Sequence, residues 1–239
     1  MSDQPDYLLV DIGNSRIKYA LVKAGQAEFQ VHSCAHVGDL SSVIQQAQKV
    51  LVASVGKIAL TDELQSICAQ YQRSCQLLNT QAQQFGIRCA YENFATLGVD
   101  RWLAMLAARL LTDKAVAVID LGTANTCDII IGDQHLGGWI APGFTMMKQA
   151  LISNTQKVFA DQQMAQQLNV GRSTPDCVNM GCLAALQGFV AMADQYLANH
   201  TKDYQILVTG GDQGLVSAIN HPHLIYFPNL VLVGLSRFL

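Results

Sequence analysis

The chain has 239 residues, of which 50% are hydrophobic and 14% are charged. This is enough apolar material for a sizeable core, in one large domain or two small ones. A net charge of −3 gives no broad cationic surface, so we expect no nucleic-acid partner and no membrane partner. The N-terminus lacks the order of a secretory signal, and no apolar run approaches the ~20 residues of a membrane span, which favours a cytoplasmic protein.

The seven cysteines form no C-x-x-C pair, which argues against a disulfide framework and against a zinc knuckle. We expect them to be free and mostly buried.

The first informative stretch is DYLLVDIGNSRIKYALV, residues 6–22, which is typical of a strand, a tight turn and a second strand. Its apolar run ends at Asp11, and a carboxylate there suits a phosphate only with a divalent metal between them. Gly13 lets backbone N–H groups approach an anion, Asn14 and Ser15 add neutral donors, and Lys18 adds a cation. One such hairpin alone could equally be an ordinary polar turn.

The pattern returns in KAVAVIDLGTANTCDIII, where Asp120 follows Asp11 by 109 residues, close to half the chain. A repeat at half-length predicts two similar lobes that face each other across a cleft, each with an aspartate at the mouth of its hairpin. The second copy has Gly122, Thr123 and Thr126 but no basic residue, which suits a phosphate tail or a cation. Chance resemblance between two short hairpins is the alternative.

The remaining segments alternate strand and helix patterns in chain order, which indicates an α/β fold. The seam between the halves falls near residues 111–115, giving expected lobes of residues 1–113 and 114–239. The expected elements are a strand that ends in a glycine turn over 49–56, a helix at 60–72 with Thr61 as a possible cap, a helix at 100–111, helices at 145–159 and 180–200, and a strand, glycine turn and helix over 204–219.

Two further motifs could carry chemistry. Gly210 and Gly211 follow an apolar strand and would let a flat nucleoside approach the backbone. Asp100 and Arg101 open a helix, where they could be an N-cap and a surface charge, or a general base beside an anion-binding arginine.

Read together, DIGNSRIK, LGVDR, DLGTANT, GGWIAPG and VTGGDQG, in this order, closely resemble the motifs of type III pantothenate kinase. That bacterial family belongs to the acetate kinase and actin superfamily. The resemblance implies a duplicated ribonuclease-H-like (actin-like ATPase) fold with two lobes and a cleft between them.

The resemblance also implies roles for individual residues. Asp100 would be the catalytic base, Asp120 would hold a monovalent cation, K⁺ or NH₄⁺, and Asp11 would meet Mg²⁺ directly or through water. The ATP-binding residues would be Asp11, Ile12, Gly13, Asn14, Ser15 (usually Thr in the family), Arg16, Ile17, Lys18 and Thr123. The substrate-binding residues would be Tyr91, Gly98, Val99, Asp100, Arg101 and, across a dimer interface, Thr174.

The implied activity is ATP-dependent phosphorylation of pantothenate to 4′-phosphopantothenate by a homodimer, the first step of coenzyme A biosynthesis. One alternative is a kinase of the same superfamily with another alcohol or acid as its substrate. Another is a non-catalytic regulator, because relatives of this family were first described as accessory transcription factors. The negative net charge and the absence of a basic helix argue against direct DNA binding.

Overall fold

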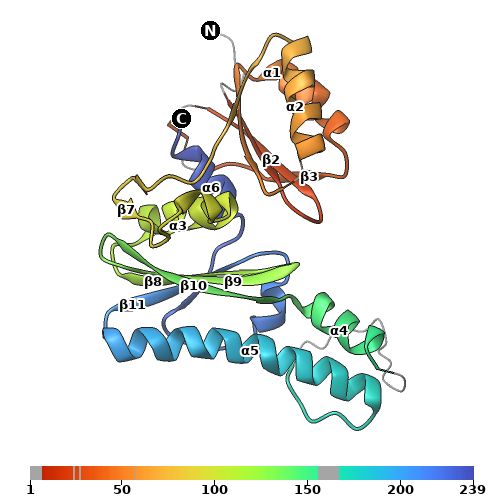
Figure 1. Ribbon diagram of the computed structural model, residues 1–239, viewed down its shortest axis with the longest axis vertical. Helices are drawn as coiled ribbons and strands as arrows, with labels where there is room; N and C mark the ends of the chain where they lie inside the picture. Colours follow the sequence, from red (N-terminus) through yellow and green to blue (C-terminus); the bar gives the residue numbers. More distant parts are fainter. Residues whose placement is uncertain (1–6, 24, 27, 57, 156–166) are drawn as a thin grey trace. The chain divides into compact units, whose positions relative to one another are not determined.

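The computed structural model describes residues 7–23, 25–26, 28–56, 58–155 and 167–239 (Figure 1). The chain forms two compact units, Met1–Leu111 with Asn229–Leu239, and Thr112–Pro228. Each unit is built on its own sheet.

The first unit contains a five-stranded sheet in the order β3-β2-β1-β4-β5. Strands β1, β2 and β3 form an antiparallel meander, and β4 and β5 run parallel to β1. Its strands are β1 (Tyr7–Ile12), β2 (Ile17–Val22), β3 (His32–Cys34), β4 (Lys49–Ser54) and β5 (Ser74–Leu77), with the small hairpin β6 (Gln83–Gln84) and β7 (Ile87–Arg88). Its helices are α1 (Ser41–Gln46), α2 (Ile58–Gln70), α3 (Val99–Leu111) and α6 (Leu230–Ser236), with the 3₁₀ turns η1 (Val37–Leu40) and η2 (Phe94–Thr96).

The second unit repeats this topology. Strands β8, β9 and β10 form an antiparallel meander, β11 and β12 run parallel to β8, and the order is β10-β9-β8-β11-β12. The elements are β8 (Ala115–Leu121), β9 (Ala124–Ile131), β10 (Gln134–Pro142), α4 (Phe144–Ser153), α5 (Thr174–His200), β11 (Tyr204–Thr209), η3 (Gln213–Val216) and β12 (Leu224–Tyr226). Two sheets with a meander followed by two parallel strands define a duplicated ribonuclease-H-like fold, so the predicted repeat is confirmed.

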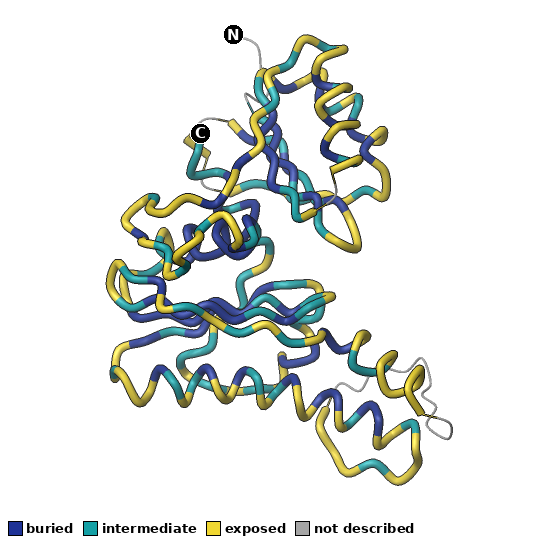
Figure 2. Tube along the Cα trace, viewed as in Figure 1, coloured by how far each residue is buried: buried dark blue, intermediate teal, exposed yellow. Residues whose placement is uncertain are grey.

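The two faces of the first sheet are covered by different helices. Leu8, Val10 and Ile12 alternate along β1 and pack with the residues of α1 and α2 in one apolar cluster. The opposite face of β1 and β4 contacts α3 and α6. Helix α3 is buried over most of its length (Figure 2).

The C-terminal helix α6 belongs to the first unit, whereas the sequence places residues 229–239 in the second half. A Cβ atom at Gly234 would lie 2.1 Å from the carbonyl oxygen of Leu103 in α3. Glycine therefore allows the two helices to touch backbone to backbone, and this long-range packing brings the end of the chain back to the first unit.

Helix α5 covers one face of the second sheet. Ala117, Ile119 and Leu121 of β8 share an apolar cluster with its buried side chains. By length and composition α5 is also apolar enough to cross a membrane, the one such helix among the described residues. This differs from the expectation that no segment is long and apolar enough to span a membrane. The contacts of α5 with β8 and β11 are nevertheless those of a core helix.

Four local expectations need correction. Thr61 does not cap α2: it is buried inside the helix and its hydroxyl donates to the hydroxyl oxygen of Ser54 at 2.9 Å. After Gly210 and Gly211 the chain forms the short 3₁₀ turn η3 instead of an α-helix. The helix expected at 145–159 begins at Phe144 and ends at Ser153, and residues 156–159 lie outside the described residues. The cysteines are free, but only Cys68, Cys127 and Cys182 are buried.

Candidate functional site

The first hairpin places an acid and a base directly opposite each other. Asp11 on β1 and Lys18 on β2 are register partners, so their side chains lie on the same face of the sheet. By alternation this is also the face of Leu9, the one that contacts α3 and α6. Both side chains are half-buried, whereas Asn14 and Ser15 in the turn are exposed. An exposed set of donors therefore lies beside a shielded carboxylate and ammonium.

The loop before α3 lies at the same edge of the first sheet. Strand β4 runs parallel to β1 with Ser54 opposite Ile12, so the carboxyl ends of the two strands are adjacent. A Cβ atom at Gly98 would lie 3.9 Å from the Cγ1 atom of Val55, the residue after β4. The structure thus brings the first turn of α3, with Asp100, to the sheet edge that carries the Asp11 hairpin.

Asp100 lies inside the first turn of α3, which begins at Val99, so its interpretation as an N-cap is wrong. Its Oδ1 atom accepts a hydrogen bond from the backbone N–H of Arg101 at 2.8 Å. The same oxygen is 2.6 Å from the position of a Cβ atom at Gly98. The half-buried carboxylate therefore occupies space that only glycine leaves open, and a hydrogen bond holds it there.

Arg101 is buried, with 7% of its surface exposed, so its interpretation as a surface charge is also wrong. Its Nη1 atom donates to the hydroxyl oxygen of Tyr91 at 3.1 Å, and its guanidinium lies 5.9 Å from the Tyr91 ring centroid. A buried guanidinium held by a phenol is well suited to bind an anion, because burial strengthens the attraction.

Thr80 supports the loop before α3, a role that no sequence pattern indicates. This residue is 5% exposed, and its hydroxyl donates to the carbonyl oxygen of Leu97 at 2.8 Å. Leu97 immediately precedes Gly98, so Thr80 fixes the backbone that leads into Asp100. A single threonine between two strands carries no pattern from which this contact could be read.

In the second hairpin the register partner of Asp120 is Thr126, where the first hairpin has Lys18. A Cβ atom at Gly210, whose φ is +101°, would lie 2.5 Å from Oδ1 of Asp120. A Cβ atom at Gly143 would lie 2.6 Å from the carbonyl oxygen of Thr123. The motifs that contain Gly143 and Gly210 therefore support the second hairpin, a role that their sequences alone did not reveal.

Within the described ranges, no group of three or more His, Cys, Asp or Glu side chains could hold a metal ion. Asp11 fits Mg²⁺ as a single carboxylate, because that ion is commonly bound by one or two carboxylates together with substrate phosphates and water. At Asp120, the backbone of Gly210 packs closely against the carboxylate and against Leu121, whose carbonyl oxygen accepts a hydrogen bond from the backbone N–H of Asp212 at 2.9 Å. The donor that this hairpin offers to a hard cation is therefore the carboxylate of Asp120.

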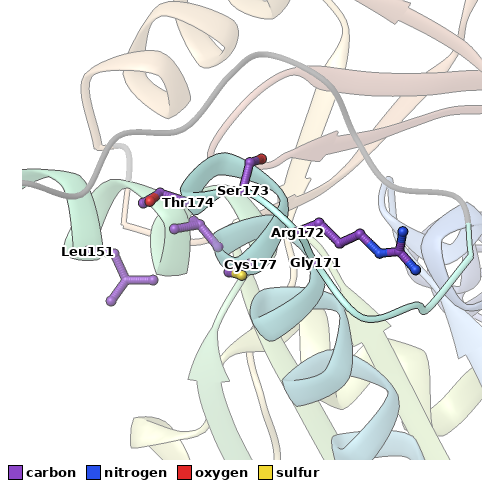
Figure 3. A pocket seen from close by; sticks show the side chains of 7 residues that line it. Leu151, Gly171, Arg172, Ser173, Thr174 and Cys177 are labelled. Carbon is purple, nitrogen blue, oxygen red and sulfur yellow. The ribbon is translucent and has the colours of Figure 1, made fainter.

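Thr174 begins α5 in the second unit, whereas Tyr91, Asp100 and Arg101 belong to the first. It is exposed and lines a pocket of about 650 Å³. Figure 3 shows Ser173, Thr174 and Cys177 at the first turn of the helix, with Leu151 of α4 beside them. The pocket offers apolar side chains, the hydroxyl groups of Ser173 and Thr174, and the side chain of Arg172 to a small ligand.

Two ribonuclease-H-like units, each with an aspartate-bearing hairpin, place the chain in the actin-like fold class. The family model for type III pantothenate kinase matches residues 7–195. The chain belongs to the type III pantothenate kinase family, which confirms the prediction made from its five motifs.

Relatives that match nearly the whole chain belong to the same family. The type III pantothenate kinase of Pseudoalteromonas atlantica is 48% identical over 100% of this chain and 99% of the relative. That of Pseudoalteromonas translucida is 38% identical over 96% and 94%.

Two solved structures support the fold alone. A Campylobacter jejuni protein assigned to the Baf family of transcriptional activators superposes with a TM-score of 0.61 at 23% identity, covering 96% of both chains. The ethanolamine utilization protein EutJ of Carboxydothermus hydrogenoformans gives a TM-score of 0.50 at 10% identity, covering 97% of this chain and 89% of that one.

Proposed function

We propose that this chain transfers the γ-phosphoryl group of ATP to the primary hydroxyl of pantothenate, giving 4′-phosphopantothenate and ADP. Membership of the type III pantothenate kinase family supports this reaction. The structural observation that carries it is the half-buried Asp100 in the first turn of α3, next to the buried pair of Arg101 and Tyr91.

Asp100 acts as the general base. Its carboxylate accepts the proton of the pantothenate hydroxyl as the bond to phosphorus forms. Arg101, oriented by Tyr91, binds the carboxylate of pantothenate. Gly98 and Val99, where the loop meets α3, contribute to the same pantothenate site. Thr80 is a positioning residue, since it acts only through the backbone of Leu97.

The first hairpin binds the phosphates of ATP through residues 11–18. Lys18 neutralises phosphate charge, and the exposed turn with Asn14 and Ser15 supplies neutral donors. Asp11 would hold Mg²⁺ directly or through water, and the ion would supply charge neutralisation at the phosphates. Phosphoryl transfer needs mainly positioning and charge neutralisation, which these groups supply.

The second hairpin completes the nucleotide contacts. Thr123 donates to ATP, and Asp120 holds the monovalent cation, K⁺ or NH₄⁺, with oxygen ligands. In the glycine turn, Gly210 packs against the second hairpin, whereas a Cβ atom at Gly211 would meet nothing within 4 Å, so the backbone there is accessible to the nucleoside.

We also propose that the protein is a cytoplasmic homodimer in which Thr174 of one copy contacts the pantothenate of the other. A surface of α5 and β10 supports an interface between copies. It forms a groove of about 510 Å³ lined by Trp139, Ala185, Gly188, Phe189, Met192, Gln195, Tyr196 and Asn199. Trp139 makes edge contacts with Phe189 and Tyr196, and Met192 is 50% exposed. Partly exposed aromatic residues and methionine are enriched at protein interfaces.

An ADP-release assay tests the reaction. The protein is incubated with Mg-ATP and either pantothenate, glucose, glycerol or acetate, with and without K⁺, and the phosphorylated product is identified by its mass. We expect product with pantothenate only, and faster with K⁺. Turnover of a sugar but not of pantothenate would favour the other superfamily kinases, and no turnover of any acceptor would favour a non-catalytic regulator.

A further inference from the structure

Two cysteines of the first unit face each other between α2 and β5. The buried residues of α2, namely Thr61, Leu64 and Cys68, form a stripe at helical spacing that faces the sheet. Cys75 on β5 is the parallel register partner of Val50, so both side chains lie on the sheet face that α2 covers. Cys75 therefore packs against the same apolar cluster that contains Cys68.

The turn between the two elements holds them close together. The backbone N–H of Arg73 donates to the carbonyl oxygen of Cys68 at 2.8 Å. Gln72 adopts a φ of 55°, which reverses the chain directly after the helix. The two cysteines thus face each other across a short, fixed connection instead of a long flexible loop.

The two thiols are chemically unequal. The Cys68 thiol donates a hydrogen bond to Cys75, and this bond, together with burial, raises the pKa of Cys68. The same bond lowers the pKa of Cys75, because it stabilises the thiolate. Cys68 is buried, whereas Cys75 is half-buried. An accessible thiol with a lowered pKa beside a buried partner is the arrangement of an attacking and a resolving cysteine.

We propose that Cys68 and Cys75 form an oxidisable thiol pair, a modification site that closes to a disulfide when the protein meets a low-molecular-weight disulfide. The Cys75 thiolate attacks one sulfur of oxidised glutathione, which forms a mixed disulfide and releases one glutathione thiolate. Cys68 then loses its proton and attacks the sulfur of Cys75, and the second glutathione leaves as a thiolate. The protein loses two protons and two electrons, and the oxidised glutathione gains them and becomes two molecules of glutathione. The pair does not depend on the function proposed above.

The sequence makes the test direct, because trypsin cleaves after Arg73, between the two cysteines. Cys68 falls in peptide 58–73 and Cys75 in peptide 74–88, and neither peptide contains another cysteine. The full chain is equilibrated with oxidised glutathione, its remaining thiols are alkylated at low pH, and the digest is analysed by mass spectrometry. We expect the two peptides linked, with the mass of two hydrogen atoms missing, and separated again after reduction.

Two variants make the result specific. Cys75→Ser is expected to abolish the linked species and leave Cys68 alkylated. Cys34→Ser is the matched control: Cys34 is also half-buried in the first unit, but burial and the nearby Asp39 raise its pKa, so this variant should leave the link unchanged. The proposal is overturned if both peptides of the wild type remain alkylated while the exposed Cys177 is glutathionylated. It is equally overturned if Cys75 carries glutathione and Cys68 stays free, and the wild-type result decides even if a variant fails to fold.

Discussion

Gly98 leaves open the space beside the Asp100 carboxylate: a Cβ atom at position 98 would lie 2.6 Å from Oδ1 of Asp100. The affected atom is the end of a flexible side chain and not part of the backbone. A methyl group there therefore displaces the carboxylate while the fold survives. This relationship separates effects on chemistry from effects on stability.

Gly98→Ala is accordingly expected to lower turnover by roughly 10- to 100-fold, because displacing a catalytic group by about 1 Å can cost that much. The melting temperature should change little. Gly38→Ala is the matched control in the same unit, since a Cβ atom there meets nothing within 4 Å. Steady-state kinetics and thermal unfolding measure both quantities, and wild-type turnover in Gly98→Ala would contradict the tight placement of Asp100.

Asp100→Asn removes the proton acceptor while keeping the size of the side chain. We expect turnover to fall by about 100-fold or more, with little change in the Kd for pantothenate measured by calorimetry. Asp62→Asn, at an exposed position on α2, controls for the loss of one negative charge. Near-normal turnover in Asp100→Asn would remove Asp100 from the role of base.

Thr80 supports the same loop from behind, so its removal tests positioning. Thr80→Val keeps the shape but leaves the buried carbonyl oxygen of Leu97 without this donor, at a cost of about 1–3 kcal/mol in the free energy of unfolding. We expect kcat to fall with it, and Thr80→Ser, which keeps the hydroxyl, to recover most of the activity. A loss of kcat in Thr80→Ser with normal kcat in Thr80→Val would indicate that the methyl group, not the hydrogen bond, positions the loop.

Much of this architecture could be predicted from the sequence because the information is local. Alternating apolar residues that end at Asp11 and Asp120 define the two hairpins, and the glycine after each aspartate marks its turn. Both hairpins form where they are expected, and the repeated sheet topology follows from them.

The features that the sequence did not reveal depend on contacts between distant residues. The return of α6 to the first unit depends on Gly234 meeting Leu103, far apart in the chain. The buried pair of Asp128 and His135, joined at 3.0 Å, shows no ligand or catalytic spacing. The position of Arg101 in its motif fits a surface charge as well as a buried one, and only packing distinguishes the two. Burial of a polar residue is a property of the packed fold, which hydrophobic patterning cannot report.

Asp11→Asn tests the metal assignment of the first hairpin. An amide is a weaker Mg²⁺ ligand than a carboxylate. We expect a clear rise in the Mg²⁺ concentration needed for half-maximal activity, or loss of activity. Asp113→Asn, at an exposed position, is the control for net charge. An unchanged Mg²⁺ titration would count against Asp11 as a ligand.

Asp212 makes the stability of the second unit depend on pH. Burial raises the pKa of its carboxyl, so the folded protein favours the neutral form more than the unfolded chain does. At a pH below the ordinary carboxyl pKa both states are protonated and there is no penalty. As the pH rises, the unfolded chain ionises first, and stability is lost until the pH exceeds the raised pKa of the folded state.

Asp212→Asn removes this ionisation and keeps the backbone N–H that donates to the carbonyl oxygen of Leu121 at 2.9 Å. The variant should therefore melt at a higher temperature than the wild type at neutral pH, and the difference should shrink as the pH falls through the carboxyl range. Asp133→Asn, at an exposed turn of the same unit, should show no such trend. Thermal unfolding across a pH series measures the difference directly. A variant less stable than the wild type at neutral pH would mean that ionised Asp212 makes a favourable contact that outweighs the cost of its burial.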